Sequence, residues 1–196
     1  MTAASKKTKP KTKRSASPPS STALPAWDSI SRHLHVLVDT PRGSGVKFKL
    51  DVEKRCYTIS HILPPGTVFP FDFGSIPGTL AEDGDPLDVL ILMETPAFSG
   101  CLVPVRLIGA LEAKQTQEGK TNRNDRLIGV AAESRTYREI HELDDVPAHL
   151  LAELEHFFVS YNEERGRRFR VLRRVGPERA KRLVASGERR FRRKEG

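Results

Sequence analysis

The sequence predicts an α+β fold that is mainly β: a closed barrel followed by two C-terminal helices. Short segments with apolar and polar residues in alternation fill most of the first two thirds of the chain. Loops rich in Gly and Pro separate these segments, which favours a closed barrel over a parallel sheet. Helical spacing of apolar residues begins only after about residue 144. The chain of 196 residues is long enough for one domain with a substantial core and too short for two full-size domains.

Six segments are expected to form strands. The first two are HLHVLVDT (33–40) and GVKFKLDV (45–52), and the Pro-Arg-Gly-Ser-Gly turn between them predicts that they pair as a hairpin. The remaining four are residues 56–63, 88–93, 101–113 and 126–132.

Two helices are expected near the C-terminus. The segment DDVPAHLLAELEHFFVSYNEER opens with an Asp that is a candidate cap and has Pro147 in its first turn. Its apolar face consists of Leu150, Leu151, Leu154, Phe157, Phe158 and Tyr161. Residues 176–194 form a second, strongly basic helix, again with Pro just inside its start.

Charge divides the chain into basic ends and an acidic middle. Residues 1–14 hold six basic and no acidic residues, and the chain from Glu163 onward holds 14 basic and five acidic residues. Residues 1–26 have too little apolar area to offset chain entropy, so we expect a disordered basic tail followed by one domain at 27–196. Nucleic acid is a possible partner of this tail. It is not favoured, because no aromatic residue is interleaved among the lysines to stack on bases.

Localisation is expected to be cytoplasmic, with no membrane partner. No apolar run approaches the ~18 residues of a membrane span, and the N-terminus has no apolar secretory segment. Cys56 and Cys101 lack the spacing of a thiolate metal site and fit a reducing compartment.

Three aspartates crowd into the short stretch DGDPLD: Asp83, Asp85 and Asp88. A plain turn is one interpretation, because Asp-Gly and Asp-Pro pairs are common in loops. A calcium loop ending at Glu94 is a second, although its sixth position needs Gly and here holds Asp88. The third is a site for hard divalent cations such as Mg²⁺, which would remove the repulsion between the carboxylates and activate water.

The run DGDPLDV resembles the signature of family I soluble inorganic pyrophosphatases. Its context agrees, since VFPFDFGSIPGTL, immediately upstream, is similar to the family's aromatic segment. VLVDTPRGSGVKFKLD resembles the family's opening hairpin, and DVPAHLLAELEHFFVSYNEERGRRFRV resembles its long helix. The resemblance covers roughly residues 34–185.

This resemblance implies a five-stranded barrel of the oligonucleotide-binding (OB) type with flanking helices. It also implies hydrolysis of pyrophosphate to two phosphates by metal-activated water, with Mg²⁺ as cofactor, in a homo-oligomer. By position, Asp83 and Asp88 match metal ligands and Asp85 matches the catalytic aspartate that orients or deprotonates water. The implied substrate-binding residues are Lys47, His61, Phe73, Arg126 and Tyr161. Tyr161 could equally be a core residue of the long helix.

The chain departs from the family pattern at several positions. Lys49 stands in place of a glutamate, and the other replacements are Asp39 for Glu, His61 for Arg, Phe69 and Phe73 for Tyr, and Asn162 for Lys. Two further metal-ligand aspartates fall near Gln115 and on Asn124, with Glu118 and Asp125 as alternatives in the same hairpin. The alternative function is therefore a catalytically weakened homologue that binds a phosphate ligand or nucleic acid.

Overall fold

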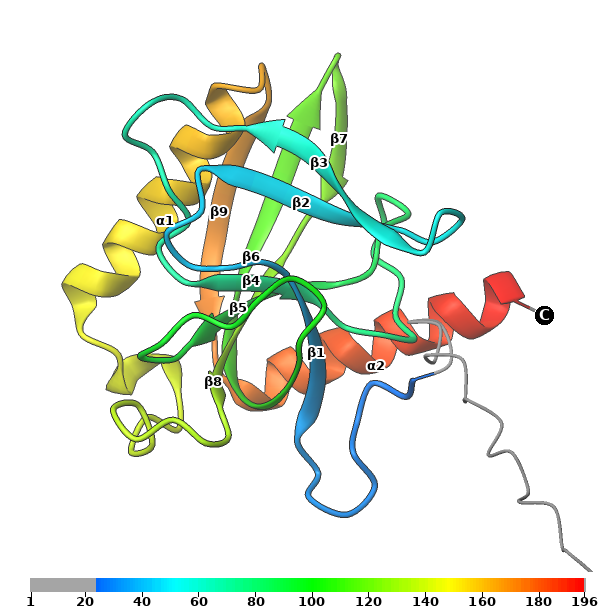
Figure 1. The fold of residues 1–196 in the computed structure, drawn as a ribbon, viewed down its shortest axis with the longest axis vertical. Coiled ribbons are helices and arrows are strands. Elements are labelled where there is room, and N and C mark those ends of the chain that lie inside the picture. Colours follow the sequence, from blue (N-terminus) through cyan, green and yellow to red (C-terminus); the bar gives the residue numbers. More distant parts are fainter. Residues whose placement is uncertain (1–23, 196) are drawn as a thin grey trace, which may run out of the picture.

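The computed structural model describes residues 24–195, which form a β-barrel with two α-helices packed outside it (Figure 1). The tail prediction for residues 1–23 lies outside this part of the chain. The strands are β1 (Leu34–Thr40), β2 (Val46–Asp51), β3 (Cys56–Ile62), β4 (Asp72–Ser75), β5 (Asp88–Leu92), β6 (Leu102–Gln117), β7 (Lys120–Arg123), β8 (Arg126–Ala131) and β9 (Arg168–Val175). The helices are the short 3-10 helix η2 (Leu143–Asp145), α1 (Ala148–Glu163) and α2 (Pro177–Glu195).

Five of these strands close into a ring, which confirms the predicted five-stranded barrel. β1 pairs with β4, β4 with β5, β5 with β8, β8 with β6, and β6 returns to β1. The β5–β8 pair is parallel and the other four pairs are antiparallel. Closing the ring leaves none of its five strands with an unpaired edge.

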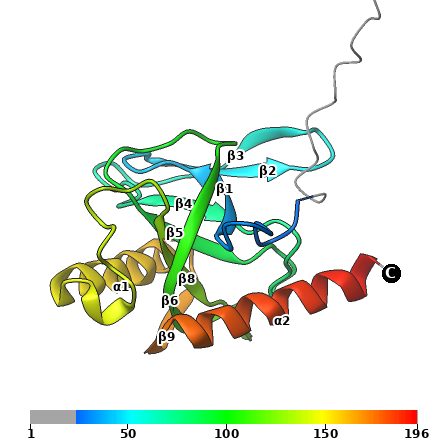
Figure 2. The ribbon, with the colours of Figure 1, turned by 90° about the horizontal axis from the view of Figure 1, so that it is seen from below.

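The predicted hairpin between segments 33–40 and 45–52 is wrong. Both edges of β1 are occupied by β4 and β6, so β2 pairs with β3 instead, in a separate two-stranded sheet. The turn that joins β2 to β3 is closed by Asp51, whose Oδ1 accepts a hydrogen bond from the Lys54 amide at 2.9 Å. The β2–β3 hairpin lies on one side of the barrel and both α-helices lie on the other (Figure 2).

Three strands were not expected: β4, β7 and β9. β4 has only four residues, and β7 is the short return strand that pairs with the far end of β6. β9 follows α1 and pairs antiparallel with β6 outside the ring. Its alternation of arginine with apolar residues fits one buried and one solvated face.

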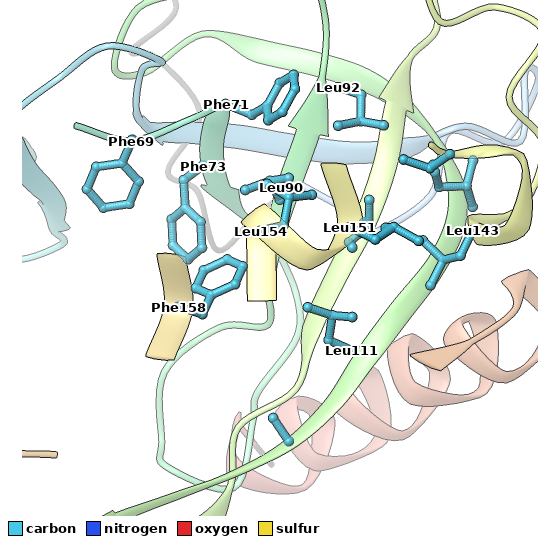
Figure 3. Packing of buried hydrophobic residues seen from close by; sticks show 14 of the residues in the cluster. Phe69, Phe71, Phe73, Leu90, Leu92, Leu111, Leu143, Leu151, Leu154 and Phe158 are labelled. Atoms are coloured by element: carbon cyan, nitrogen blue, oxygen red, sulfur yellow. The ribbon is translucent and has the colours of Figure 1, made fainter. Parts of the chain in front are cut away.

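Two apolar clusters pack on the two faces of the barrel strands. Leu90 and Leu92 belong to the cluster that packs against α1, which contributes Leu151, Leu154 and Phe158 (Figure 3). Their neighbours Val89 and Ile91 point the other way and join a cluster that includes Ala180 and Val184 of α2. The alternation of strand side chains therefore attaches one helix to each cluster.

The ends of the packed chain differ slightly from expectation. Ala26 is buried and its carbonyl accepts a hydrogen bond from the His35 amide at 2.8 Å, so the packed segment begins before residue 27. The N-cap position of α1 is Pro147, and the expected Asp cap is wrong, because Asp145 caps η2 by accepting from the His141 and Glu142 amides. Among the described residues, no helix has the length and apolar character needed to cross a membrane.

Candidate active site

A cavity of about 560 Å³ lies between the β2–β3 hairpin and the starts of β5 and β8. We call it the aspartate cavity, because its wall includes the carboxylates of Asp39, Asp83, Asp85 and Asp88. Cationic side chains line the same space: Lys47, Lys49, Arg126, Arg165 and Arg167. The three clustered aspartates therefore face a set of cations across one cavity.

Asp83 and Asp85 lie on the loop between β4 and β5, residues 76–87, which we call the aspartate loop. The base of this loop is fixed by Thr79, whose hydroxyl donates to the Ile76 carbonyl at 2.7 Å and accepts from the Leu87 amide at 3.1 Å. At its tip, the Asp85 amide donates to Asp83 Oδ1 at 3.2 Å. Gly84 between them has φ of +91°, a backbone conformation that favours glycine. The stretch is thus a turn as well as a carboxylate cluster.

The calcium-loop interpretation is excluded by the position of Glu94. This carboxylate accepts hydrogen bonds from the Ser134 hydroxyl at 2.7 Å and from the Arg135 and Thr136 amides at 2.7 and 2.9 Å. These hydrogen bonds, led by that of Ser134, lower the pKa of Glu94 to about 2. Glu94 follows the far end of β5, so it supports a loop there rather than closing a calcium site with Asp83.

Asp88 and Arg126 are the first residues of the parallel strands β5 and β8, which places them side by side. Arg126 Nη1 donates to Asp88 Oδ2 at 2.6 Å and also to Asn124 Oδ1. The guanidinium is buried and lies 5.5 Å from the ring centroids of Phe158 and Phe169. Its Nε is buried and has no hydrogen-bond partner within residues 24–195.

Lys47 and Asp39 are two further charged residues of the cavity wall. The Lys47 ammonium lies 3.9 Å from the ring centroid of Phe73, and burial lowers its pKa although Asp88 and Asp39 oppose this. Burial raises the pKa of Asp39 to about 7, with Lys47 opposing and Asp88 adding to the rise. Burial, together with the charges of Asp88 and Asp85, also raises the pKa of Asp83. Burial therefore disfavours the ionised forms of Asp39 and Asp83, although five cationic side chains line the same cavity.

Lys49 contacts the residue expected to act on water. Its ammonium lies 2.6 Å from Asp85 Oδ1, and both side chains are more than half exposed. A family member with glutamate at this position would have no such pair. The lysine at position 49, where the family pattern has a glutamate, thus forms an ion pair with Asp85.

The β6–β7–β8 hairpin brings two amides to the cavity in place of carboxylates. Gln115 and Asn124 both line it, and Asn124 Nδ2 donates to Gln115 Oε1 at 2.9 Å. Asp125 is directed elsewhere, since it accepts from the Ala113 amide at 2.9 Å and from Arg123 Nη2 at 3.0 Å. Glu118 is exposed in the turn of the hairpin. Of the four candidates, only the two amides line the cavity that Asp88 also lines.

The remaining expected substrate-binding residues are partly brought together. Phe73 and Tyr161 line the cavity, and the Tyr161 hydroxyl accepts a hydrogen bond from Arg165 Nη1 at 2.7 Å. His61 lies beside the cavity wall rather than in it, with its ring centroid 6.4 Å from that of Tyr161. Asn162 is buried in α1, where its Nδ2 donates to the Phe158 carbonyl at 2.8 Å.

Sequence reasoning missed Arg165 and Arg167, which add two guanidinium groups to the cavity. A signal for Arg165 was present, because it follows Tyr161 by four residues and continues the same helical face. Arg167 follows the turn at Gly166, where φ is +66°. Its orientation depends on that turn and was not readable from helical spacing.

The donor set of the cavity fits a hard divalent cation. Carboxylate and amide oxygens are ligands that Mg²⁺ accepts, usually through one or two carboxylates, with substrate phosphates and water completing its shell. Burial is the main cause of the raised pKa values of Asp39 and Asp83, and a bound cation would stabilise the ionised form of each. Within residues 24–195, no group of three His, Cys, Asp or Glu side chains is arranged so that it could hold a metal ion by itself. The set therefore suits an ion that shares its ligands with a phosphate substrate.

Comparison with known proteins agrees with this site. A family model described as inorganic pyrophosphatase matches residues 36–192. The inorganic pyrophosphatase of Thermus thermophilus is 37% identical over 139 residues, which cover 71% of this chain and 77% of that protein. That of Geobacillus stearothermophilus is 33% identical over 151 residues, covering 77% of this chain and 89% of the relative.

The barrel is also similar to solved structures. A crystal structure of inorganic pyrophosphatase from Thermus thermophilus superposes with a TM-score of 0.79 at 32% identity, covering 89% of this chain and 99% of that one. One from Coxiella burnetii superposes with a TM-score of 0.77 at 30% identity, covering 86% and 99%. The chain belongs to the family I inorganic pyrophosphatases.

Proposed function

We propose that this protein hydrolyses inorganic pyrophosphate to two phosphates in a Mg²⁺-dependent reaction. The observation that carries the proposal is the aspartate cavity, in which Asp83, Asp85 and Asp88 face Lys47 and Arg126. Pyrophosphate is small and multiply charged, and a cavity with both metal-ligating oxygens and fixed cations suits it. Membership of the family supports the same reaction.

Asp83 and Asp88 would hold the cation. Asp39, Gln115 and Asn124 line the same cavity and offer further oxygen atoms. Bound Mg²⁺ supplies charge neutralisation at phosphate oxygens and favours ionisation of water near neutral pH. Because Asp88 starts a barrel strand and Asp83 lies on a braced loop, these oxygens are held in position before any ligand binds.

The phosphate groups would be bound by Lys47, Arg126 and the Arg165–Tyr161 pair. Arg126 lines the cavity with a planar guanidinium, a group that suits phosphate oxygens. Phe73 keeps water away from one side of the Lys47 ammonium, which strengthens its attraction for an anion. Arg167 extends the positive wall on the side of α1.

Asp85 would accept the proton of the attacking water on a carboxylate oxygen. The water oxygen forms a bond to one phosphorus, the bridging phosphorus–oxygen bond breaks, and the second phosphate leaves with the electron pair. The Lys49 ammonium lies on Asp85 Oδ1, so this oxygen is free for the proton only when Lys49 withdraws. Lys49 would thus slow proton transfer compared with an acidic residue at this place.

Phosphate release from pyrophosphate tests the proposal. With Mg²⁺ the wild-type chain should release phosphate, and Asp85→Asn should reduce kcat by about a hundredfold or more. Asp51→Asn is the matched control, because Asp51 pairs with Lys54 at the end of β2 and does not line the aspartate cavity. Failure of the wild type to release phosphate with Mg²⁺, Mn²⁺ or Co²⁺ would refute hydrolysis.

A second candidate is binding of a phosphate ligand without turnover. Two observations favour it: the Lys49–Asp85 ion pair and the neutral amides Gln115 and Asn124 opposite Asp88. This candidate predicts calorimetric binding of pyrophosphate that weakens in Lys47→Met while no phosphate is released. Release of phosphate by the wild type at a rate that Asp85→Asn abolishes excludes it.

We further propose a homo-oligomer in the cytoplasm. Large apolar side chains are exposed on the described surface, including Ile59 and Ile62 on β3 and Phe98 before β6, and such residues are candidates for a subunit interface. Light scattering after gel filtration measures the mass directly. A mass of one chain across the micromolar range contradicts the oligomer.

A further inference from the structure

A second cavity of about 620 Å³ lies between α2, the aspartate loop and the β7–β8 junction. We call it the arginine cavity. Its wall contains five arginines and two carboxylates, Glu82 and Asp125. The arginines are Arg123 of β7 and Arg179, Arg182, Arg189 and Arg190 of α2.

The arginines converge because of helical spacing on α2. Arg179, Arg182 and Ser186 follow one another at intervals of three and four residues, and Arg189 and Arg190 continue the same face. Arg123 reaches this space from β7, where it is paired with Lys114 of β6. The cavity is therefore bounded by a helix, a sheet and the aspartate loop.

Some of this positive charge is already neutralised by one buried carboxylate. Glu112 accepts hydrogen bonds from Arg173 Nε and Arg179 Nε, both at 2.7 Å, and lies 3.4 Å from Arg123 Nη2. Burial alone would raise the pKa of Glu112, but the arginines outweigh it and lower the pKa to about 2. The Glu112 carboxylate thus forms ion pairs with three guanidinium groups. Arg123 forms a second ion pair, with Asp125.

The other arginines keep donors for an additional partner. Arg190 donates from Nε to the Leu80 carbonyl at 2.7 Å and from Nη1 to Ser186 at 3.0 Å, so its contacts are to neutral groups. Among the described residues, Arg182 and Arg189 make no ion pair. Guanidinium groups gathered in a concave site repel one another unless an anion lies between them.

We propose that the arginine cavity is a second anion site, which binds a small phosphate-bearing anion with two or more negative charges. Planar guanidinium groups bind phosphate oxygens in pairs, and the volume suits a small molecule. The charges meet in a concave site flanked by Glu82 and Asp125, whereas an extended nucleic-acid backbone needs a continuous basic surface. The site is separate from the aspartate cavity and does not depend on hydrolysis.

The arginine cavity is connected to the aspartate cavity through the backbone. Leu80, whose carbonyl accepts from Arg190, donates its own amide to the Gly187 carbonyl at 3.1 Å, which ties the aspartate loop to α2. Asp125 lies in sequence between Asn124 and Arg126, both of which line the aspartate cavity. An anion bound to Arg182, Arg189 and Arg190 should therefore steady the loop that holds Asp83 and Asp85.

Calorimetric titration in EDTA tests binding without turnover. The probes are inorganic phosphate, pyrophosphate and adenosine triphosphate, added to the wild-type chain and to Arg182→Gln/Arg189→Gln. The double variant should lose one of two binding events or weaken it by about tenfold or more. Lys47→Met should keep that event, because Lys47 lines only the aspartate cavity.

Lys181→Gln/Arg193→Gln is the matched control, since it removes the same charge from exposed positions of α2 outside the cavity. Thermal unfolding shows whether each variant is folded. Equal stoichiometry and affinity in the two double variants would overturn the proposal. Tighter arginine-dependent binding of a single-stranded oligonucleotide than of any small probe would overturn the assignment of the ligand.

Hydrogen exchange tests the connection between the cavities. Exchange of the Leu80 amide should slow when the small anion binds to the wild type in EDTA, and should be unchanged in Arg182→Gln/Arg189→Gln. Unaltered exchange in the wild type at saturation contradicts the link. Phosphate release by Arg182→Gln/Arg189→Gln is measured separately. It tests the proposed hydrolysis, so a failure of anion binding at the arginine cavity can be told apart from a failure of hydrolysis.

Discussion

Gln115 and Asn124 determine how strongly the aspartate cavity attracts a cation. An amide oxygen coordinates Mg²⁺ but adds no charge, so the ion gains less than it would from a carboxylate. Arg126 lowers this attraction further, because its fixed positive group contacts both Asp88 and Asn124. Two cationic side chains, Arg126 and Lys49, thus contact the carboxylates that a cation would otherwise bridge.

Restoring two carboxylates should strengthen Mg²⁺ binding. We expect Gln115→Glu/Asn124→Asp to lower the Kd for Mg²⁺ by about tenfold, because the count of charged ligands sets affinity at such sites. Calorimetry without substrate measures this change. Gln117→Glu/Thr121→Asp is the control, since it adds the same charge at exposed positions of the β6–β7 hairpin outside the cavity. A Kd that falls equally in the control would attribute the effect to net charge alone.

Asp39 should make stability depend on pH between about 4 and 7. Burial raises its folded-state pKa to about 7, above the ordinary value of an unfolded aspartate, so the folded state binds more protons in this window. The free energy of unfolding should therefore fall as pH rises, by up to about 1.4 kcal/mol per pH unit from this group.

Urea unfolding in EDTA at pH 4, 5.5 and 7 checks this effect against Asp39→Asn. The variant has no carboxyl to titrate, so the stability of the wild type relative to the variant should decrease through the window and level off above pH 7. A difference between the two proteins that is constant with pH would show that Asp39 is already charged at pH 4.

The aspartates could be predicted from the sequence because Asp83, Asp85 and Asp88 are close in the chain. Gln115 and Asn124 required a count through a hairpin, and a slip of one residue there would have selected Asp125 instead. The position of His61 beside the wall, and the contact of Lys49 with Asp85, depend on how the β2–β3 hairpin sits over the barrel. Such packing between separate sheets leaves no pattern in the sequence.

At the scale of elements, β4 pairs with β1 so closely at Gly74 that no side chain fits at this position. A Cβ atom there would lie 2.4 Å from the Leu37 carbonyl oxygen and 2.8 Å from Val36 Cγ1. The first of these atoms belongs to the backbone of a paired strand, so it cannot turn aside. Glycine at this position allows the two strands to approach closely enough to close the ring.

Gly74→Ala should destabilise the protein by about 1–3 kcal/mol, the usual cost of overpacking. Urea unfolding measures the change. Gly45→Ala is the matched control, because its Cβ would meet only the Thr67 carbonyl oxygen at an ordinary 3.6 Å. Equal stability of the two variants would mean that β4 can move away from β1 at little cost.

The elements with strong periodicity were predicted well, and their pairing was not. Residues 88–93 and 126–132 match β5 and β8, and the α1 face holds the expected buried leucines. The β1–β2 hairpin failed because pairing depends on which edges other strands occupy, a property of the whole sheet. β4 and β7 are too short to show a period, and no strand was expected at β9.

At the scale of the whole molecule, the acidic barrel should be stabilised by divalent cations. Mg²⁺ that binds only the folded state raises the midpoint of thermal unfolding by mass action. We expect millimolar Mg²⁺ to raise Tm by a few degrees relative to EDTA. Asp83→Asn/Asp88→Asn should lose this rise, and NaCl at matched ionic strength should not reproduce it. A rise that survives in the double variant would place the bound cation elsewhere.

The parallel pair β5–β8 joins Asp88 to Arg126 across a long stretch of chain. Val89 lies opposite Leu127 in this pair, so the register that buries these apolar residues also sets the two charged ones together. A shift of the β5–β8 register by one residue would turn the side chains of one strand to the opposite face. It would remove both the apolar packing and the Asp88–Arg126 ion pair. During folding, contacts so distant in sequence form late, because the intervening loop must first be closed. Binding of metal or phosphate at this place should therefore begin only after β5 and β8 have paired, which makes ligand binding a kinetic probe of that pairing.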